Sequence, residues 1–314
     1  MQPRSTFLAS LALAALAPRI ATAQTLATLR ATSAIDDPAT PFLYALDSGL
    51  FRKNGLDASI ERATSGAASA SAVVGGSFEV GKASVISFLS AHVHALPLIA
   101  VAAAGDYDSS RPNTALGVRP DAPIHTGADL NGKIVAVSAL NDLFSIAARC
   151  WIDAHGGDSS TIKLIELPMS TAAEGIAAGR VDASVIVEPF LDQALQAGTI
   201  RSLGDPVAAI GKHHTDSVWF MTTDYVKANP DVVNRFMRSI RDASIYVNGH
   251  PAETAPLLVE FAKLKSTDAL KNRTLEGTRL DPANFQPMID AAARYKIIPE
   301  RFDARELIYA DALR

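Results

Sequence analysis

The sequence predicts an α/β protein of two lobes, each built on a mostly parallel sheet with helices packed against it. Short apolar segments typical of strands alternate with helical segments of roughly ten residues, and this alternation favours parallel sheets. It occurs twice, before and after about Asn113. The helices near the C-terminus have no strands of their own, so we expect the chain to return to the first lobe.

The first unit opens with a strand followed by an amphipathic helix, in which Phe42, Leu46 and Leu50 repeat at helical spacing before Gly55. Two further strand and helix pairs follow, and then a last strand. The expected strands are residues 26–32, 56–60, 78–80 and 98–103, and the expected helices are residues 41–53, 67–74 and 85–91.

The second unit repeats this order. The expected strands are residues 115–118, 134–137, 162–167, 183–187 and 218–222, and the expected helices are residues 141–155 and 171–178. Asn229 as cap and Pro230 at the first helical position then predict a long helix to about Val247. Two more helices begin near Pro251 and Pro282.

The N-terminus has the order of a secretory signal peptide. Arg4 precedes an apolar run over residues 7–17, and the small residues Ala21, Thr22 and Ala23 follow. The run is shorter than the roughly 20 residues that cross a bilayer. We therefore expect residues 1–23 to be removed and the mature chain to begin at Gln24.

The net charge and the cysteine content indicate which binding partners and covalent modifications to expect. Loss of Arg4 and Arg19 leaves 27 basic against 33 acidic residues, so the formal charge moves from −4 to −6. Without a basic run or a second long apolar segment, we expect neither nucleic acid nor a membrane as partner. Cys150 is the only cysteine, which predicts a small buried side chain, no disulfide and no lipid anchor. These features predict a soluble protein of the periplasm.

Four segments resemble the nitrate, sulfonate and taurine class of ABC-transporter substrate-binding proteins. Residues 41–57 (PFLYALDSGLFRKNGLD) look like the opening helix of that class. The others, in matching order, are residues 129–138 (DLNGKIVAVS), 177–183 (AAGRVDA) leading to 188–190 (EPF), and 225–231 (YVKANPD).

This resemblance implies the two-lobed periplasmic binding protein fold of type II, with two hinge crossings and a ligand cleft. By similarity, one lobe comprises residues 24–111 and 226–314, and the other residues 112–225. The implied function is the substrate-binding component of an ABC importer: a monomer that captures a small polar or anionic solute and delivers it to an inner-membrane permease.

Parallel sheets carry ligand-binding loops at the carboxyl ends of their strands, which directs attention to several turns. In the second lobe, Ser138 ends a strand, and Ala139 and Asn141 precede a helix whose free amides suit an anion. Helix capping is the simpler interpretation of the same residues.

In the first lobe, Ser65-Gly66 and Ala83-Ser84 offer serine hydroxyls and closely approachable backbone, although plain turns are equally compatible. Asp36 would repel a simple anion and favour a ligand with an amine or hydroxyls. For Asp36 and its neighbour Asp37, solvated turn residues before Pro38 are the simpler interpretation.

Glu188 and Phe190 follow a buried strand. The resemblance makes Glu188 a hinge or cleft residue that bonds a ligand or a backbone amide across the lobes, with Phe190 as a packing wall. His214 and Trp219 are further candidates for the cleft. A histidine in a loop and a tryptophan in a core strand are the simpler interpretations of these two residues.

Other motifs are misleading. Residues 76–83 (GSFEVGKA) nearly match a phosphate loop, but Ala83 lacks the hydroxyl that holds magnesium. His92 with His94, and His213 with His214, lack the spacing of a helical zinc pair. No nucleophile elbow occurs. We therefore expect no enzyme activity, no metal site and no cofactor.

Two alternatives stay open. Related folds include enzymes of thiamine-pyrimidine and menaquinone synthesis, although the pyrimidine-forming relatives carry a cysteine-rich motif that a chain with one cysteine cannot have. A ligand-sensing module for a membrane kinase is the other alternative. The sequence does not identify the ligand among sulfonates, nitrate-like anions, taurine-like zwitterions, aromatic acids and heterocycles.

Overall fold

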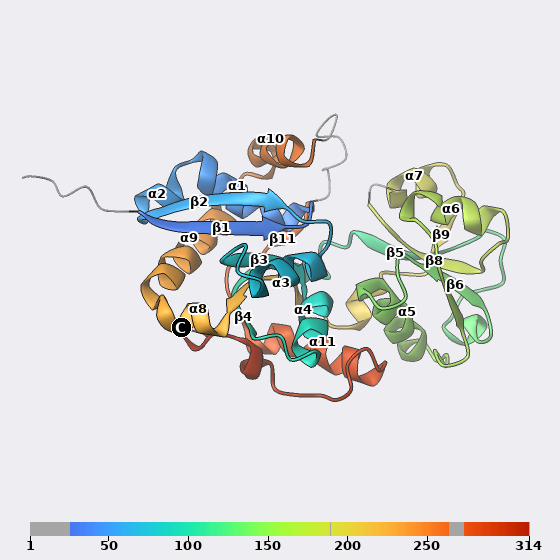
Figure 1. The fold of residues 1–314 in the computed structure, drawn as a ribbon. Helices are drawn as coiled ribbons and strands as arrows, with labels where there is room; N and C mark the ends of the chain where they lie inside the picture. Colours follow the sequence, from blue (N-terminus) through green and yellow to red (C-terminus); the bar gives the residue numbers. More distant parts are fainter. Residues whose placement is uncertain (1–25, 189, 264–272, 314) are drawn as a thin grey trace, which may run out of the picture.

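The computed structural model describes residues 26–188, 190–263 and 273–313, and these form two lobes, each around its own mixed sheet (Figure 1). The first sheet has the strand order β11-β4-β10-β3-β1-β2. Its strands are β1 (Ala27–Ser33), β2 (Leu56–Arg62), β3 (Val80–Ser84), β4 (Leu98–Asp108), β10 (His213–Thr222) and β11 (Leu275–Glu276). β1, β2 and β3 are parallel, whereas β10 runs antiparallel to both β3 and β4.

The second sheet has the strand order β7-β6-β8-β5-β9. Its strands are β5 (Thr114–Val118), β6 (Ile134–Val137), β7 (Lys163–Glu166), β8 (Ala183–Val187) and β9 (Arg201–Ser202). β6, β7 and β8 are parallel, and β5 runs antiparallel beside β8. The predicted α/β class with two sheet-based halves is therefore confirmed.

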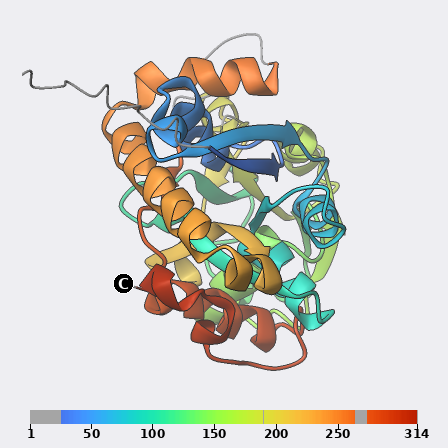
Figure 2. The ribbon, with the colours of Figure 1, turned by 60° about the vertical axis from the view of Figure 1, so that its left-hand side comes forward.

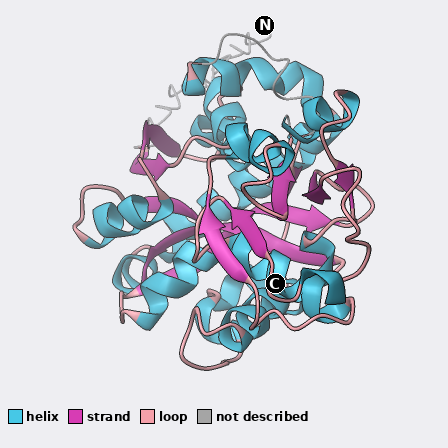
Figure 3. Cartoon of the chain, turned by 90° about the vertical axis from the view of Figure 1, so that its right-hand side faces the viewer, coloured by secondary structure: helices cyan, strands magenta, loops and turns pink. Residues whose placement is uncertain are grey.

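Helices cover both faces of each sheet, and strands lie between helices in the side view (Figure 3). One face of the first sheet packs on α1 (Thr40–Asp47), α2 (Leu50–Lys53) and α9 (Pro230–Gly249). Its other face packs on α3 (Gly66–Val74), α4 (Val85–Val93) and α11 (Pro282–Arg294). The second sheet lies between α5 (Leu143–Ala154) and the pair α6 (Met169–Ala177) and α7 (Phe190–Gln196).

Two sequence predictions in the first lobe had wrong boundaries. The helix expected over residues 41–53 is two helices, because Gly49 adopts a left-handed conformation with φ of 71° and begins a new turn. The strand expected at residues 78–80 instead runs from Val80 to Ser84. Gly81 and Lys82 carry little strand propensity and are placed in β3 by pairing with β1 and β10.

The chain crosses between the lobes after β4 and again before β10. β10 begins at His213, so more of this strand lies in the first sheet than the predicted 218–222 segment. The limits of the two lobes drawn from sequence stay a prediction. The predicted signal peptide falls outside the described residues. In the part of the chain that the structure describes, no helix combines the length and apolarity of a membrane crossing.

After β10, the chain stays with the first lobe. The segment 218–222, expected in the second unit, is therefore part of the first sheet, because β10 pairs with β3 and β4. α8 (Thr223–Ala228) leads into α9, which lies diagonally across the lobe, and α10 (Pro251–Ala262) lies beyond β1 and β2 (Figure 2). Trp219 of β10 contacts Phe42, with ring centroids 5.2 Å apart, and Phe236 of α9 at 6.1 Å. This aromatic cluster joins the N-terminal helix, the returning strand and the C-terminal helix in one core.

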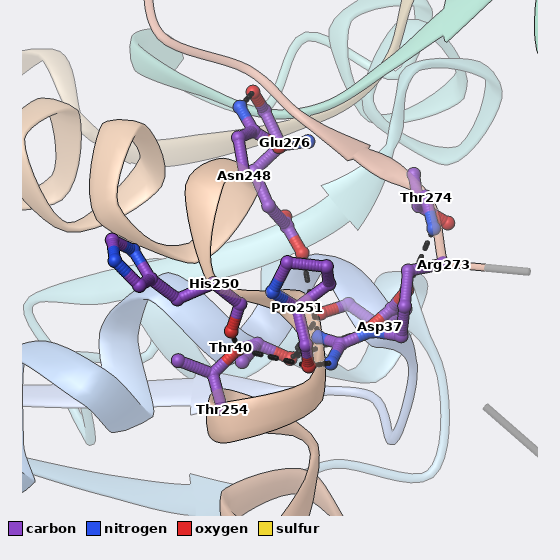
Figure 4. A network of polar contacts seen from close by, with 9 residues as sticks. All are labelled: Asp37, Thr40, Asn248, His250, Pro251, Thr254, Arg273, Thr274 and Glu276. Atoms are coloured by element: carbon purple, nitrogen blue, oxygen red, sulfur yellow. Dashed lines mark hydrogen bonds and ion pairs between the residues drawn. The ribbon is translucent and has the colours of Figure 1, made fainter. Parts of the chain in front are cut away.

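The C-terminal return also fixes the loop that follows β1 (Figure 4). Arg273 donates from Nε to Asp37 at 2.5 Å and from Nη2 to Thr40 at 2.9 Å, and the Thr274 amide donates to Asp37 at 2.7 Å. The Arg273 side chain is buried, and the Asp37 side chain is only 14% exposed. Burial raises the pKa of the Asp37 carboxyl, while Arg273 and the Thr274 amide oppose the rise. Asp37 is therefore not the solvated turn residue expected from sequence.

The crossing strands hold a second buried polar group. Register shifts between β10 and β4 occur next to Thr215 and Ser217, and polar side-chain atoms of Asp106, Thr215 and Ser217 are buried there without a hydrogen-bond partner among the described residues. Burial, with a smaller contribution from Asp216, raises the pKa of Asp106 to about 7, and Thr215 and His214 oppose the rise. The hinge region is thus polar inside.

Replacing Arg273 with Met should destabilise the protein by about 3–5 kcal/mol, because the buried Asp37 carboxylate loses its cation. Urea unfolding followed by tryptophan fluorescence measures the change. The matched control is Arg279→Met, which removes the same charge from an exposed position and should change stability by at most about 0.5 kcal/mol. Equal effects of the two substitutions would show that the Asp37 pair does not hold the loop.

The Asp106→Asn variant should lose part of the pH dependence of unfolding. A carboxyl whose pKa is raised on folding favours the native state at low pH, and this contribution is lost as pH rises from the unfolded value of about 4 to the folded pKa of about 7. Wild-type stability should therefore fall by up to about 1.4 kcal/mol per pH unit more than that of the variant in this range. Parallel curves for both proteins between pH 4 and 7 would contradict the assignment.

Candidate functional site

The predicted site residues lie at the carboxyl ends of the parallel strands. β1, β2 and β3 end at Ser33, Arg62 and Ser84, on one edge of the first sheet. β6 and β8, which are also parallel, end at Val137 and Val187 on one edge of the second sheet. Parallel topology thus gathers turns that are far apart in sequence, although it does not test ligand contact.

Asp36, in the loop after β1, forms an ion pair with a lysine that the sequence did not point to. Lys82 Nζ lies 2.6 Å from Oδ1 and 2.7 Å from Oδ2 of Asp36. The Lys82 side chain is fully buried, whereas the Asp36 side chain is 43% exposed. The negative charge of Asp36 at this edge is therefore largely balanced. A lysine next to a predicted strand is the sequence signal for this pair, although Lys82 also lies in the segment that nearly matches a phosphate loop.

Ser65 and Ser84 cap the two helices that start at this edge. The Ser65 hydroxyl accepts from the Ala68 amide at 3.1 Å, and the Ser84 hydroxyl accepts from the Ser87 amide at 3.2 Å. Both serines are exposed, whereas Ala83 is buried. Gly66 is required by packing, because a Cβ there would lie 2.8 Å from that of Ala83. Both serines are thus helix caps, a role that the sequence interpretation of plain turns did not include, and their contact with a ligand stays a prediction.

In the second lobe, the turn after β6 is organised around a cap. Asp142 accepts from the Ser145 amide at 2.9 Å and also bonds the Ser138 hydroxyl, so Ser138 is engaged at the start of α5. Burial raises the pKa of Asp142, and these donors oppose the rise. The Leu140 amide donates to Glu166 at 2.9 Å, which joins this turn to the end of β7. Ala139 is half-buried, and Asn141 is exposed beside the cap.

Glu188 accepts from the Asp192 amide at 3.2 Å and so caps α7 within its own lobe. The expected contact of Glu188 with a ligand or with a backbone amide across the lobes stays a prediction. Phe190 is half-buried and packs on the core beneath α6 and α7. Both residues lie at the edge predicted from sequence, next to the carboxyl end of β8.

His214 and Trp219 are fully buried and belong to the core of the crossing strand. The His214 ring stacks on Tyr107 with centroids 4.7 Å apart, and Trp219 packs between aromatic rings of the first lobe. A ligand would reach either side chain only after rearrangement of β10. The core interpretation of Trp219 is confirmed, and the loop interpretation of His214 is wrong because it lies in a strand.

The lobes contact each other through α5 and α11. Asp153 of α5 accepts from Arg294 Nη2 and from the Tyr295 hydroxyl, both at 2.9 Å. Cys150 lies on the same helix and is buried against the core of the first lobe, as predicted for a small buried side chain. Burial raises the pKa of the Cys150 thiol.

A cavity of about 490 Å³ is lined by residues of both lobes. Asn141 contributes from the second lobe, and α3 and α4 contribute Ala67 and Ser87 near their starts. In the ribbon, α3 and α4 lie on the side of the first lobe that faces α5 (Figure 1). The cavity is thus lined near the capped starts of α3 and α4 and by Asn141 from the turn before α5. Amides that remain uncapped at a helix start favour an anionic or strongly polar group.

Solved structures of binding proteins share this fold. The periplasmic aliphatic sulphonate-binding protein SsuA of Escherichia coli matches with a TM-score of 0.73 at 20% identity, over 90% of this chain and 92% of that chain. The periplasmic nitrate-binding protein NrtA of Synechocystis PCC 6803 matches with a TM-score of 0.67 at 15% identity, over 91% and 87%.

An enzyme also has this fold. A mutant of DszB, a desulfurization enzyme, in complex with biphenyl-2-sulfinic acid matches with a TM-score of 0.65 at 18% identity, over 91% of this chain and 97% of that chain. No curated protein sequence matches. The family model described as NMT1/THI5 like matches residues 38–254, which is more than half of the sequence. The chain therefore belongs to the NMT1/THI5-like family.

Proposed function

We propose that this protein is the periplasmic substrate-binding component of an ABC importer. It captures a small polar or anionic organic solute of the sulfonate, taurine or nitrate-like class between its lobes and delivers the solute to an inner-membrane permease. We further propose that the protein acts as a monomer. The observation that carries this proposal is the cavity lined by both lobes, near the capped starts of α3 and α4 and by Asn141 from the turn before α5.

Capture by closure follows from this geometry. A solute that contacts Asn141 on one lobe and the starts of α3 and α4 on the other makes more contacts when the lobes approach. Only such a difference in affinity between two states shifts their populations. The α5–α11 contact is the place where the lobes already touch, so closure changes the angle around that contact and the two crossing strands.

The charge balance of the first loop supports an anionic solute. Asp36 and Asp37 would repel an anion if they stood alone, but Lys82 and Arg273 hold them in ion pairs. The amides at the helix starts then contribute a net positive potential near the cavity. The expectation that Asp36 favours an amine-bearing ligand assumed an unpaired carboxylate, whereas Asp36 is paired with Lys82.

An enzyme is the second candidate, because DszB has the same fold. The position of Cys150 disfavours a cysteine nucleophile, since its thiol is buried in α5 against α11, away from the strand ends, and burial raises its pKa. We therefore favour binding over catalysis.

The first test is a thermal-shift screen of sulfonates, carboxylates and nitrate on the mature protein. A solute that binds the native state should stabilise it by about 2.7 kcal/mol at 100 times its dissociation constant. Mass spectrometry of the mixture should recover the solute unchanged. Conversion of any stabilising compound into a product would favour the enzyme instead.

The Asn141→Asp substitution should weaken binding of an anionic solute about fivefold, because it places a negative charge in the interlobe cavity at a cost of about 1 kcal/mol in water. Titration calorimetry measures this change. The control is Asn131→Asp, the same substitution at an exposed turn of the same lobe. An equal loss in both variants would place the solute elsewhere.

A further inference from the structure

The interlobe cavity continues as a groove between α3 and α4. Ala67, Ala70 and Ser71 line it from α3, at the three- and four-residue spacing that places side chains on one helix face. Ser87, Ser90, Ala91 and His94 line it from α4 with the same spacing. The groove is therefore a continuous feature of two adjacent helix faces.

Small side chains explain why this space is open. The opposite side of α4 carries Phe88 and Leu89, which are buried in the core of the first lobe. The groove side carries only alanine, serine and histidine after Ile86. Larger residues at Ser87, Ser90 or Ala70 would fill the volume. The sequence of the two helices thus leaves a shaped hollow next to the helix starts.

Both ends of the groove carry polar groups, and small alanine and serine side chains line the stretch between them. One end has the starts of α3 and α4, and Asn141 lines the cavity from the second lobe. The far end has Lys296 and His94, while Leu96 and Ile297 supply apolar surface beside them. Along α4, Ser87 and His94 are seven residues apart, which corresponds to about 10 Å.

Lys296, at the far end of the groove, has a strained left-handed backbone conformation. It follows α11 in a left-handed conformation with φ of 60°, and its amide donates to the Ala293 carbonyl at 3.1 Å. Glycine is the usual residue at such a helix end, and other residues there carry strain. Lysine also favours the negative end of a helix, so its charge has a structural role as well. The lining residues of the cavity include lysine and histidine but no carboxylate.

We propose that this groove binds the body of an organic anion about 10 Å long. The anionic head lies at the helix starts beside Asn141, the apolar body lies along the small-residue faces of α3 and α4, and a second acceptor group lies at Lys296. This inference rests on the proposed solute-binding function and narrows it, because nitrate or a one-carbon sulfonate would leave the groove unfilled.

The first experiment measures chain-length dependence by titration calorimetry with 1-butanesulfonate and 1-octanesulfonate. Each methylene buried in the groove should raise affinity about fourfold. The Ser90→Leu variant, which fills the groove, should abolish this gain. The matched control is Ser77→Leu, at an exposed turn outside the cavity, and it should keep the gain.

The second experiment compares octanoate with octanedioate, which adds a carboxylate at the far end. The wild type should bind octanedioate about fivefold more tightly than octanoate, and Lys296→Gln should remove this preference. Lys263→Gln is a close control, because Lys263 also has a left-handed backbone, with φ of 55° at the end of α10, and does not line the cavity.

The outcomes separate the two proposals. If 1-butanesulfonate and 1-octanesulfonate bind equally, and Ser90→Leu and Lys296→Gln change nothing, the groove is not the solute compartment, while capture between the lobes stands. If none of these probes binds, the groove proposal is overturned. Binding of a different solute that is weakened by Asn141→Asp would then preserve the proposed function.

Discussion

The architecture depends on buried cations that hold the loop after β1. Arg273, from the C-terminal segment, pairs with Asp37, and Lys82, from β3, pairs with Asp36. Breaking a buried pair by removing one partner is expensive, because the remaining charge stays uncompensated. The loop that reaches the edge of the first sheet is thus tied to a strand beside it and to a segment more than two hundred residues away.

These pairs also determine the electrostatics of the candidate site. Two aspartates at the first strand end would give a negative edge, but each faces its own cation. What the solute meets is then mainly the polar backbone at the starts of α3, α4 and α5, with serine and aspartate side chains capping them. Caps that satisfy some amides leave others available, which makes a helix start both a stable structural element and a site for an acceptor group.

The lobes are joined by a salt bridge between helices and by two crossing strands with a polar interior. Asp153 with Arg294 and Tyr295 joins α5 to α11, and the crossing strands β4 and β10 carry buried polar atoms beside a register shift. Buried polar groups without partners are costly, and they are the kind of feature that a change in strand geometry can satisfy.

The sequence by itself determined the class of the fold, most of its longer strands and helices, and the serines and aspartates that follow the strand ends. Periodicity and capping are local properties, so Ile134–Val137 and Ala183–Val187 were predicted with their correct bounds. Only the tertiary structure decided that Lys82 and Arg273 neutralise the first loop, that His214 is buried in a strand, and that Lys296 reaches the cavity. These facts depend on contacts between residues distant in sequence, which no local pattern encodes, because the partner of a buried charge is chosen by the packing of the whole chain.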